Sequence, residues 1–199
     1  MNTTQSFLAL GDSYTIGQSV TASERFPEIT VSLLNASGKK IQPPRIIATT
    51  GWTTRDLLNA LNNNPGTFDI VTLLIGVNNQ YQGKSQDEYR SQFTTLLLKA
   101  IQYAGNRKNR VFVLSIPDYS VTPFAQGSDV AKIAREIDQF NAINKEISLS
   151  NGVNYLDITP ISREGKTDGS LQAGDGLHPS GKQYLRWAQL LAPIIAQQL

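Results

Sequence analysis

The stretch FLALGDSYTIG at residues 7–17 decides the fold. Its first four residues are apolar, which predicts a short strand that is buried on both faces. Gly11 and the polar residues after it break that run, so the strand is expected to deliver Ser13 into a sharp turn. The residues after Ser13 are expected to begin a helical turn, whose free N–H groups face outward at the end of the strand.

Similar short apolar runs alternate with longer segments of helical periodicity along the rest of the chain. This alternation is typical of repeated βα units, which build one parallel sheet with helices on its faces. We therefore expect an α/β fold in one domain, residues 1–199, with strands buried on both faces. The expected strands are residues 7–10, 45–48, 70–75, 111–115 and 153–156, and the expected helices are residues 27–36, 54–61, 85–104, 129–148 and 180–199.

Two of the expected helices carry further signals. Ser85 and Glu88 predict a capping box at the start of the third helix, and Gly105 predicts its end. In the fourth helix, apolar residues recur at spacings of three and four, which predicts one stripe that packs in the core. The residues of this stripe are Val130, Ile133, Ile137, Phe140, Ile143 and Ile147.

The composition excludes several classes of function. The 18 Lys and Arg residues nearly balance the 16 Asp and Glu residues, which leaves a net charge of +2 although the sequence pI is 8.8. A nucleic acid or another polyanion is therefore not an expected partner. The chain has no cysteine, which excludes disulfides, thiolate nucleophiles and thiolate metal sites.

The sequence carries no signal for a membrane or for export. No apolar stretch approaches the ~20 residues that a membrane-spanning helix needs. The N-terminal residues MNTTQ lack the basic start and apolar core of a secretion signal. We expect a soluble protein without a transmembrane segment, which is cytoplasmic as the sequence stands and secreted or periplasmic if a leader has been removed.

The loops that follow the strands are expected to carry the chemistry. Right-handed crossovers bring the carboxyl ends of parallel strands to one edge of the sheet, where ligands bind in open α/β folds. Ser13 follows the first strand and is a candidate nucleophile, provided that a base activates it. By itself, however, a serine at this position is better explained as the N-cap of a helix.

The segment Asp175-Gly176-Leu177-His178-Pro179 supplies a candidate base. His178 is the only histidine of the chain, so imidazole chemistry has one possible location. An acid three residues earlier can hydrogen-bond Nδ1 and leave Nε2 to take the serine proton. A local turn closed by Asp175 is the structural alternative, and Asp157 and Asp168 compete with Asp175 as the acid that orients the ring.

Two further loops offer hydrogen-bond donors. Gly51 follows the second strand and Asn78 follows the third, within Gly76-Val77-Asn78-Asn79. The N–H of a glycine can approach a substrate closely and an asparagine amide is a second donor, so together with the N–H of Ser13 they can form an oxyanion hole. Taken singly, glycine and asparagine after a strand are common turn residues.

In this order, these motifs resemble those of the GDSL or SGNH hydrolases, a family of serine esterases and lipases, over nearly the whole chain. The resemblance implies a flavodoxin-like, three-layer α/β/α sandwich with a five-stranded parallel sheet, and a reaction that needs neither metal nor cofactor. It implies Ser13 as nucleophile, His178 as base, Asp175 as its orienting acid, and Ser13, Gly51 and Asn78 as oxyanion donors. One departure is visible, because Asn79 stands where the family usually has an aspartate.

The expected activity is hydrolysis of carboxylic esters with short acyl chains, through an acyl-serine intermediate. Lysophospholipase, thioesterase, carbohydrate deacetylase and acyltransferase activities use the same motifs and stay open, as does a non-catalytic module that binds glycan or lipid. Specificity is expected from the loop at residues 116–124 and from aromatic residues in the edge loops. These tentative substrate-binding residues are Tyr14, Trp52, Tyr81, Tyr119 and Phe124. The expected partner is a small ester, and the oligomeric state is left open.

Overall fold

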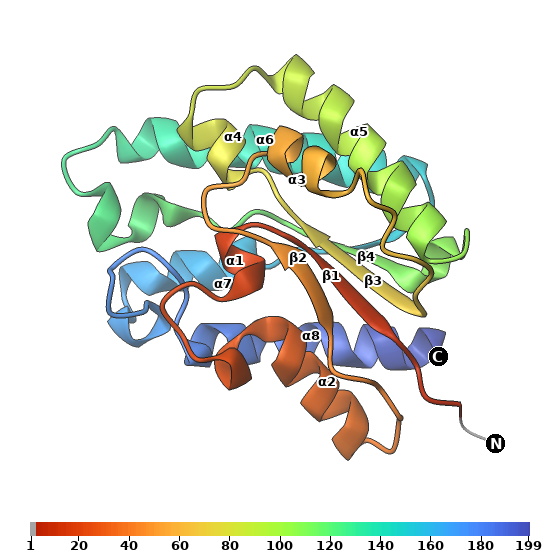
Figure 1. Ribbon diagram of the computed structural model, residues 1–199. Coiled ribbons are helices and arrows are strands. Elements are labelled where there is room, and N and C mark those ends of the chain that lie inside the picture. The colour runs from red at the N-terminus through yellow and green to blue at the C-terminus, as the bar shows by residue number, and fades with distance from the viewer. Residues whose placement is uncertain (1–2) are drawn as a thin grey trace.

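A computed structural model describes residues 3–199, so Met1 and Asn2 of the N-terminal stretch lie outside the described residues. Its sheet has five strands, all parallel, in the order β2-β1-β3-β4-β5 (Figure 1). This is the flavodoxin-like order, in which the strand order reverses between β1 and β3. The predicted five-stranded parallel sheet is therefore confirmed. The strands are β1 (Phe7–Gly11), β2 (Arg45–Ala48), β3 (Ile70–Leu74), β4 (Val111–Leu114) and β5 (Asn154–Leu156).

Helices cover both faces of the sheet, as predicted for a three-layer sandwich (Figure 1). One layer is formed by α2 (Phe26–Ala36) and α8 (Gly181–Gln198), and the opposite layer by α3 (Thr54–Ala60), α5 (Gln86–Tyr103) and α6 (Val130–Ser150). Three further short helices follow β1, β3 and β5. The first, α1 (Ser13–Ile16), is the helical turn expected at Ser13, whereas α4 (Val77–Tyr81) and α7 (Thr159–Arg163) were not predicted. Short 3₁₀ helices are η1 (Ala22–Glu24), η2 (Lys108–Arg110), η3 (Tyr119–Val121), η4 (Pro123–Ala125), η5 (Glu164–Lys166) and η6 (Gly169–Leu171).

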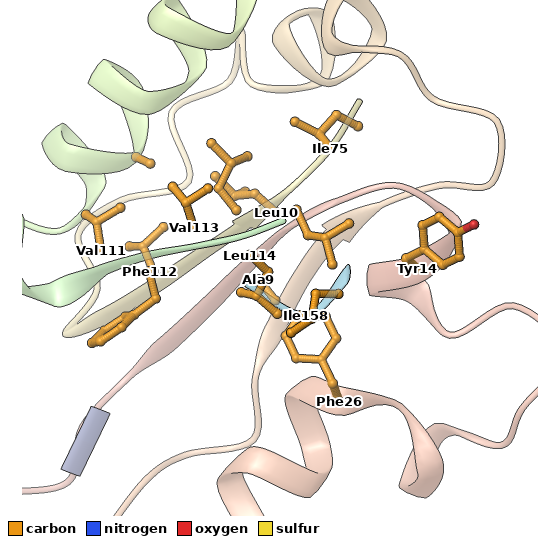
Figure 2. Packing of buried hydrophobic residues seen from close by; sticks show 14 of the residues in the cluster. Ala9, Leu10, Tyr14, Phe26, Ile75, Val111, Phe112, Val113, Leu114 and Ile158 are labelled. Carbon is orange, nitrogen blue, oxygen red and sulfur yellow. The ribbon is translucent and has the colours of Figure 1, made fainter. Parts of the chain in front are cut away.

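The core is centred on the three inner strands, β1, β3 and β4, whose residues are all buried. In β4, Val111 and Val113 point to one face and Phe112 to the other, so both helical layers pack on the same strand (Figure 2). The edge strands β2 and β5 are only half-buried. The expectation that all five strands are buried on both faces is thus wrong for these two, because an edge strand has a neighbour on one side only.

Two local predictions need correction. Ser85 does cap α5 by accepting a hydrogen bond from the N–H of Glu88, but the Glu88 carboxylate accepts from Gln92 Nε2, so no reciprocal capping box forms. Val130, the first residue of the predicted stripe on α6, is 45% exposed at the helix start. The rest of the stripe is buried, and Gly105 ends α5 in the left-handed conformation, as predicted.

Within residues 3–199, no helix combines the length and apolar character that crossing a bilayer requires.

Candidate active site

The turn between β1 and α1 brings Ser13 to the carboxyl edge of the sheet. Asp12 caps α1, because its Oδ1 accepts a hydrogen bond from the N–H of Tyr14 at 3.0 Å. Gly11 is required by close packing, since a Cβ there would lie 2.1 Å from Thr15 Oγ1 and 2.4 Å from the carbonyl oxygen of Leu74. Ser13 is thus the first helical residue, and the turn that presents it is fixed on both sides.

Asp12 is a carboxyl group in the interior of the protein. It is fully buried, and its Oδ2 has no hydrogen-bond partner. Burial penalises the charged form and raises the pKa of Asp12 to about 7, although the backbone N–H groups of Tyr14 and Gly76 act in the opposite direction. Burial therefore favours the neutral form of the aspartate next to the predicted nucleophile.

The loops after β2 and β3 bring the predicted donors to the same place. Gly51 has a φ of +85°, a conformation that other residues rarely adopt. Asn78 lies in the first turn of α4, and its Nδ2 donates a hydrogen bond to the carbonyl oxygen of Trp52 at 2.9 Å. That bond ties the two donor loops together and uses one of the two N–H bonds of the amide, which leaves the other for a ligand.

The loop before α8 holds the predicted acid and base. The distance between His178 Nδ1 and Asp175 Oδ2 is 2.6 Å, and Asp175 Oδ1 accepts from the N–H groups of Leu177 and His178 at 3.0 Å each. An ionised carboxylate can only accept, so Nδ1 carries the proton and Nε2 is left free as a base. The His178 ring meets the Tyr14 ring edge-on, with centroids 5.7 Å apart.

The environment of Asp175 keeps its carboxylate charged. Partial burial raises the pKa of Asp175, but hydrogen bonds from Ser19, from His178 and from the backbone of the loop outweigh that effect and bring it well below the usual value. The two competing acids are engaged elsewhere. Asp157 accepts from Ser115 Oγ at 2.9 Å, and Asp168 pairs with Lys182 at 2.8 Å.

An open pocket with a volume of about 150 Å³ joins these loops. The predicted nucleophile, base and donors all line it, together with four of the five tentative substrate-binding residues. Trp52 is the exception, because it does not line the pocket. Its backbone carbonyl oxygen instead accepts the hydrogen bond from Asn78 Nδ2. The predicted residues in the lining are Ser13, Tyr14, Gly51, Asn78, Tyr81, Tyr119, Phe124 and His178.

Ser13 and His178 share this pocket but are not yet hydrogen-bonded. Both side chains line the pocket and are largely buried, with Ser13 4% and His178 7% exposed. Among the described residues, however, Ser13 Oγ makes no hydrogen bond to the imidazole. Bonds between catalytic groups are often loose in the free protein and tighten around the substrate.

Within residues 3–199, no three His, Cys, Asp or Glu side chains are grouped in a way that could hold a metal ion.

One family model matches most of the chain. The model of the GDSL-like lipase/acylhydrolase family matches residues 9–186, from within β1 into α8. The chain belongs to this family. The match extends from the turn that carries Ser13 to the loop that carries Asp175 and His178.

Solved structures show the same fold at low sequence identity. The lipase/acylhydrolase from Enterococcus faecalis has a TM-score of 0.69 at 20% identity, over 97% of this chain and 94% of that one. Esterase EstA from a Pseudoalteromonas species has a TM-score of 0.69 at 19% identity, over 97% of both chains. The acetylxylan esterase Axe2 from Geobacillus stearothermophilus has a TM-score of 0.66 at 21% identity, over 98% and 93%. Among curated proteins, none matches the chain significantly.

The asparagine that departs from the pattern of GDSL-like enzymes has a well-defined place. Asn79 is buried, its Oδ1 accepts from the N–H of Thr54 at 3.0 Å, and its Nδ2 donates to Thr54 Oγ1 at 2.7 Å. The Thr54 hydroxyl then donates to Gln92. This neutral network anchors the start of α3 to α4, so the local contacts of this loop are made without a carboxylate.

One contact to the predicted acid could not be predicted from the sequence. Ser19 Oγ donates to Asp175 Oδ2 at 2.5 Å, across 156 residues of chain. Ser19 carries no motif and lies in the loop between α1 and η1. Its backbone φ of +68° is unusual for a residue other than glycine, and a single sequence does not reveal it.

Proposed function

We propose that this GDSL-family protein is a serine esterase that hydrolyses uncharged carboxylic esters with a short apolar chain. In this proposal Ser13 is the nucleophile, His178 the base and Asp175 the acid that orients and stabilises the imidazolium. The supporting observation is that Ser13, Gly51, Asn78 and His178 come from four loops and line one pocket. A binding module would not need a serine, a base and donors to converge on the same point.

The reaction begins when Ser13 Oγ attacks the ester carbonyl carbon. His178 Nε2 takes the hydroxyl proton as the C–O bond forms, and Asp175 stabilises the resulting positive charge through Nδ1. The tetrahedral intermediate then expels the alcohol, which leaves with the proton from Nε2. The product of this half-reaction is an ester between the acyl group and Ser13.

The negative charge on the carbonyl oxygen needs donors that are already in place. The N–H groups of Ser13 and Gly51 and the free amide N–H of Asn78 are the proposed donors. The bond from Asn78 to the Trp52 carbonyl fixes the amide plane before substrate arrives. A water molecule that gives its proton to His178 Nε2 then attacks the acyl-serine, and the reverse proton transfer releases Ser13 and the acid.

The size and the lining of the pocket favour a small, uncharged substrate. A cavity of about 150 Å³ is on the order of the volume that accommodates a benzene molecule, which corresponds to a chain of about four to six carbons. Among the described residues that line it there is no Lys, Arg, Asp or Glu. A phosphate-bearing ester would therefore find no cation to pair with, which favours neutral esters over phospholipids.

Steady-state hydrolysis of p-nitrophenyl esters from acetate to dodecanoate tests this proposal. The expected result is turnover that is greatest at four to six carbons and that falls on the order of 10⁴-fold or more in Ser13→Ala. Ser128→Ala, at an exposed loop position, is the control and should match the parent. Undiminished turnover in Ser13→Ala would overturn the proposal. Transfer of the acyl group to an added alcohol, in place of water, would instead indicate an acyltransferase.

A further inference from the structure

The loop after α1 contains a serine in a conformation that favours glycine. The N–H of Val20 donates to the carbonyl oxygen of Gly17 at 3.3 Å, which closes a turn with Ser19 at its third position. Ser19 has a φ of +68°, and this position of such a turn is usually occupied by glycine or asparagine. The hydroxyl group of Ser19 must therefore offset a backbone conformation that is unfavourable for serine.

That hydroxyl group contacts the carboxylate of the proposed triad. Ser19 Oγ donates to Asp175 Oδ2 at 2.5 Å, and the same oxygen lies 2.6 Å from His178 Nδ1. The other oxygen, Oδ1, is occupied by the backbone N–H groups of Leu177 and His178. Ser19 is thus the one side chain outside the Asp175–His178 loop, within residues 3–199, that holds this carboxylate by a hydrogen bond.

The same turn is also attached to the other two parts of the site. The N–H of Gln18 donates to the carbonyl oxygen of Ser13 at 3.0 Å. Thr50, which lies next to Gly51, donates through Oγ1 to Gln18 Oε1 at 2.7 Å. Residues 17–20 therefore connect the nucleophile, a donor loop and the acid, which come from three separate regions of the chain.

We infer that Ser19 is a positioning residue, whose hydroxyl holds the Asp175 carboxylate in line with His178 Nδ1. The inference rests on the proposed function, because it assigns Ser19 a role within the same triad. Asp175 needs such support, since its side chain is 32% exposed and it lies between Gly174 and Gly176. Without Ser19, the carboxylate is free to turn toward solvent, and its charge is no longer shared between two donors.

The groups that titrate around this contact are few. Tyr14 of α1 and Tyr184 of α8 face Asp175, and burial raises the pKa of each well above 10, so both stay neutral. Asp12 lies near Tyr14 and Tyr184 at the end of β1, and burial raises its pKa to about 7. Experiments on Ser19 are therefore run in the Asp12→Asn background as well, which removes this second titration.

The chain allows a direct readout, because His178 is its only histidine. Titration of the imidazole protons by NMR reports on His178 alone, and it needs no substrate. Loss of the Ser19 hydroxyl lets the Asp175 carboxylate turn away from Nδ1, which removes part of the support for the imidazolium form, so the midpoint should fall by about half a pH unit in Ser19→Ala. The kcat for a short ester should fall about tenfold, with a smaller change in KM.

Three variants at this position separate the hydroxyl from the backbone. Ser19→Gly keeps the turn without strain but lacks the hydroxyl, and it should behave like Ser19→Ala. Ser19→Asn tolerates a positive φ and supplies an N–H donor, so it should recover part of kcat and return the midpoint toward that of the parent. Ser23→Ala, an exposed serine in η1, is the matched control and should leave both values unchanged.

The outcomes distinguish this inference from the proposed function. If Ser19→Gly equals the parent while Ser19→Ala is impaired, the residue serves only the backbone and the inference is wrong. If the His178 midpoint is the same in all variants, the hydroxyl does not act on the acid and the inference is again wrong. If the parent protein hydrolyses no ester, the proposed function fails, whereas the NMR titration still decides whether Ser19 acts through Asp175.

Discussion

Two aspartates near the proposed nucleophile lie in environments that shift the pKa of their carboxyl groups in opposite directions. Asp12 is fully buried at the end of β1, with one oxygen unpartnered, and its pKa rises to about 7. Asp175 lies in a partly exposed loop, where Ser19, His178 and two backbone N–H groups donate to it, and its pKa falls well below the usual value.

The difference shows that the balance between burial and hydrogen-bond donors sets the charge of each carboxylate. Burial without enough donors favours the neutral acid, whereas several donors outweigh partial burial. A residue that must stabilise an imidazolium has to be charged, which suits Asp175 and not Asp12. Asp12 suits a structural task, since the bond that its Oδ1 accepts from the N–H of Tyr14 caps the short helix that begins with Ser13.

The largest expected effect comes from replacing each aspartate by asparagine, which distinguishes the catalytic task of Asp175 from the structural task of Asp12. Asp175→Asn should lower kcat on the order of 10³-fold to 10⁴-fold, because an amide cannot hold the imidazole in the same tautomer or stabilise its charge. Asp12→Asn keeps an acceptor for the N–H of Tyr14 and should lower kcat less than about tenfold. Steady-state kinetics on a short ester measures both. Equal losses in the two variants would contradict the division of tasks.

The raised pKa of Asp12 predicts how stability depends on pH. Since the folded pKa of about 7 lies above the unfolded value of 3.8, the contribution of Asp12 is fully present below pH 3.8 and is lost as the pH rises through about 7. The shift corresponds to roughly 4 kcal/mol, or on the order of 10³ in the folding equilibrium. Asp12→Asn should therefore gain stability relative to the parent between pH 4 and pH 8.

Urea unfolding of both proteins across this pH range measures the difference in their free energies of unfolding. Comparison of the pair cancels the other titrating groups, which are the same in both. A difference that does not change with pH would show that Asp12 is already charged in the folded state.

The donor loops should show an effect of intermediate size. Asn78→Ala removes the proposed side-chain donor and its bond to the Trp52 carbonyl, so kcat should fall on the order of 10²-fold to 10³-fold. The KM should change less, because the donor acts on charge that develops in the transition state. Loss of affinity with an unchanged kcat would mean that Asn78 only binds substrate.

The smallest expected effect concerns chain length. Tyr81 and Phe124 are 60% and 46% exposed at the pocket, with ring centroids 6.0 Å apart, and the N–H of Phe124 donates to the carbonyl of Gly176 in the base loop. Truncation of either ring to alanine removes apolar contact with the chain. The ratio of kcat/KM for hexanoate to that for acetate should fall about tenfold. Leu98→Ala, an equally exposed position on α5, should leave the ratio unchanged.

The sequence predicted the fold well because the apolar runs are short, bounded and regularly spaced. The range of β2 was correct to the residue, since Arg45–Ala48 lies between loops rich in proline and polar residues. The short helices α4 and α7 were missed, because a helix of five residues depends on its cap and on packing more than on periodicity. Edge and central strands likewise look alike until their neighbours are known.

For the site, the sequence predicted which residues lie together at the pocket but not which contacts hold them in position. The motifs placed Ser13, Gly51, Asn78 and His178 at one edge, and the structure brings them to one pocket. The support from Ser19 rests on a positive φ and on a contact across 156 residues, neither of which leaves a local pattern. The role of Asn79 needed its partner Thr54, which belongs to another helix.

The central claim is that Ser13 is activated by His178 with the help of Asp175, and covalent labelling tests it most directly. The parent, Asp175→Asn and Asp12→Asn are treated with a fluorophosphonate, and the modified peptide is located by mass spectrometry while the rate is followed. We predict one label on Ser13, with a rate that falls at least about 100-fold in Asp175→Asn and little in Asp12→Asn. A label on another residue, or an unchanged rate in Asp175→Asn, would contradict the account.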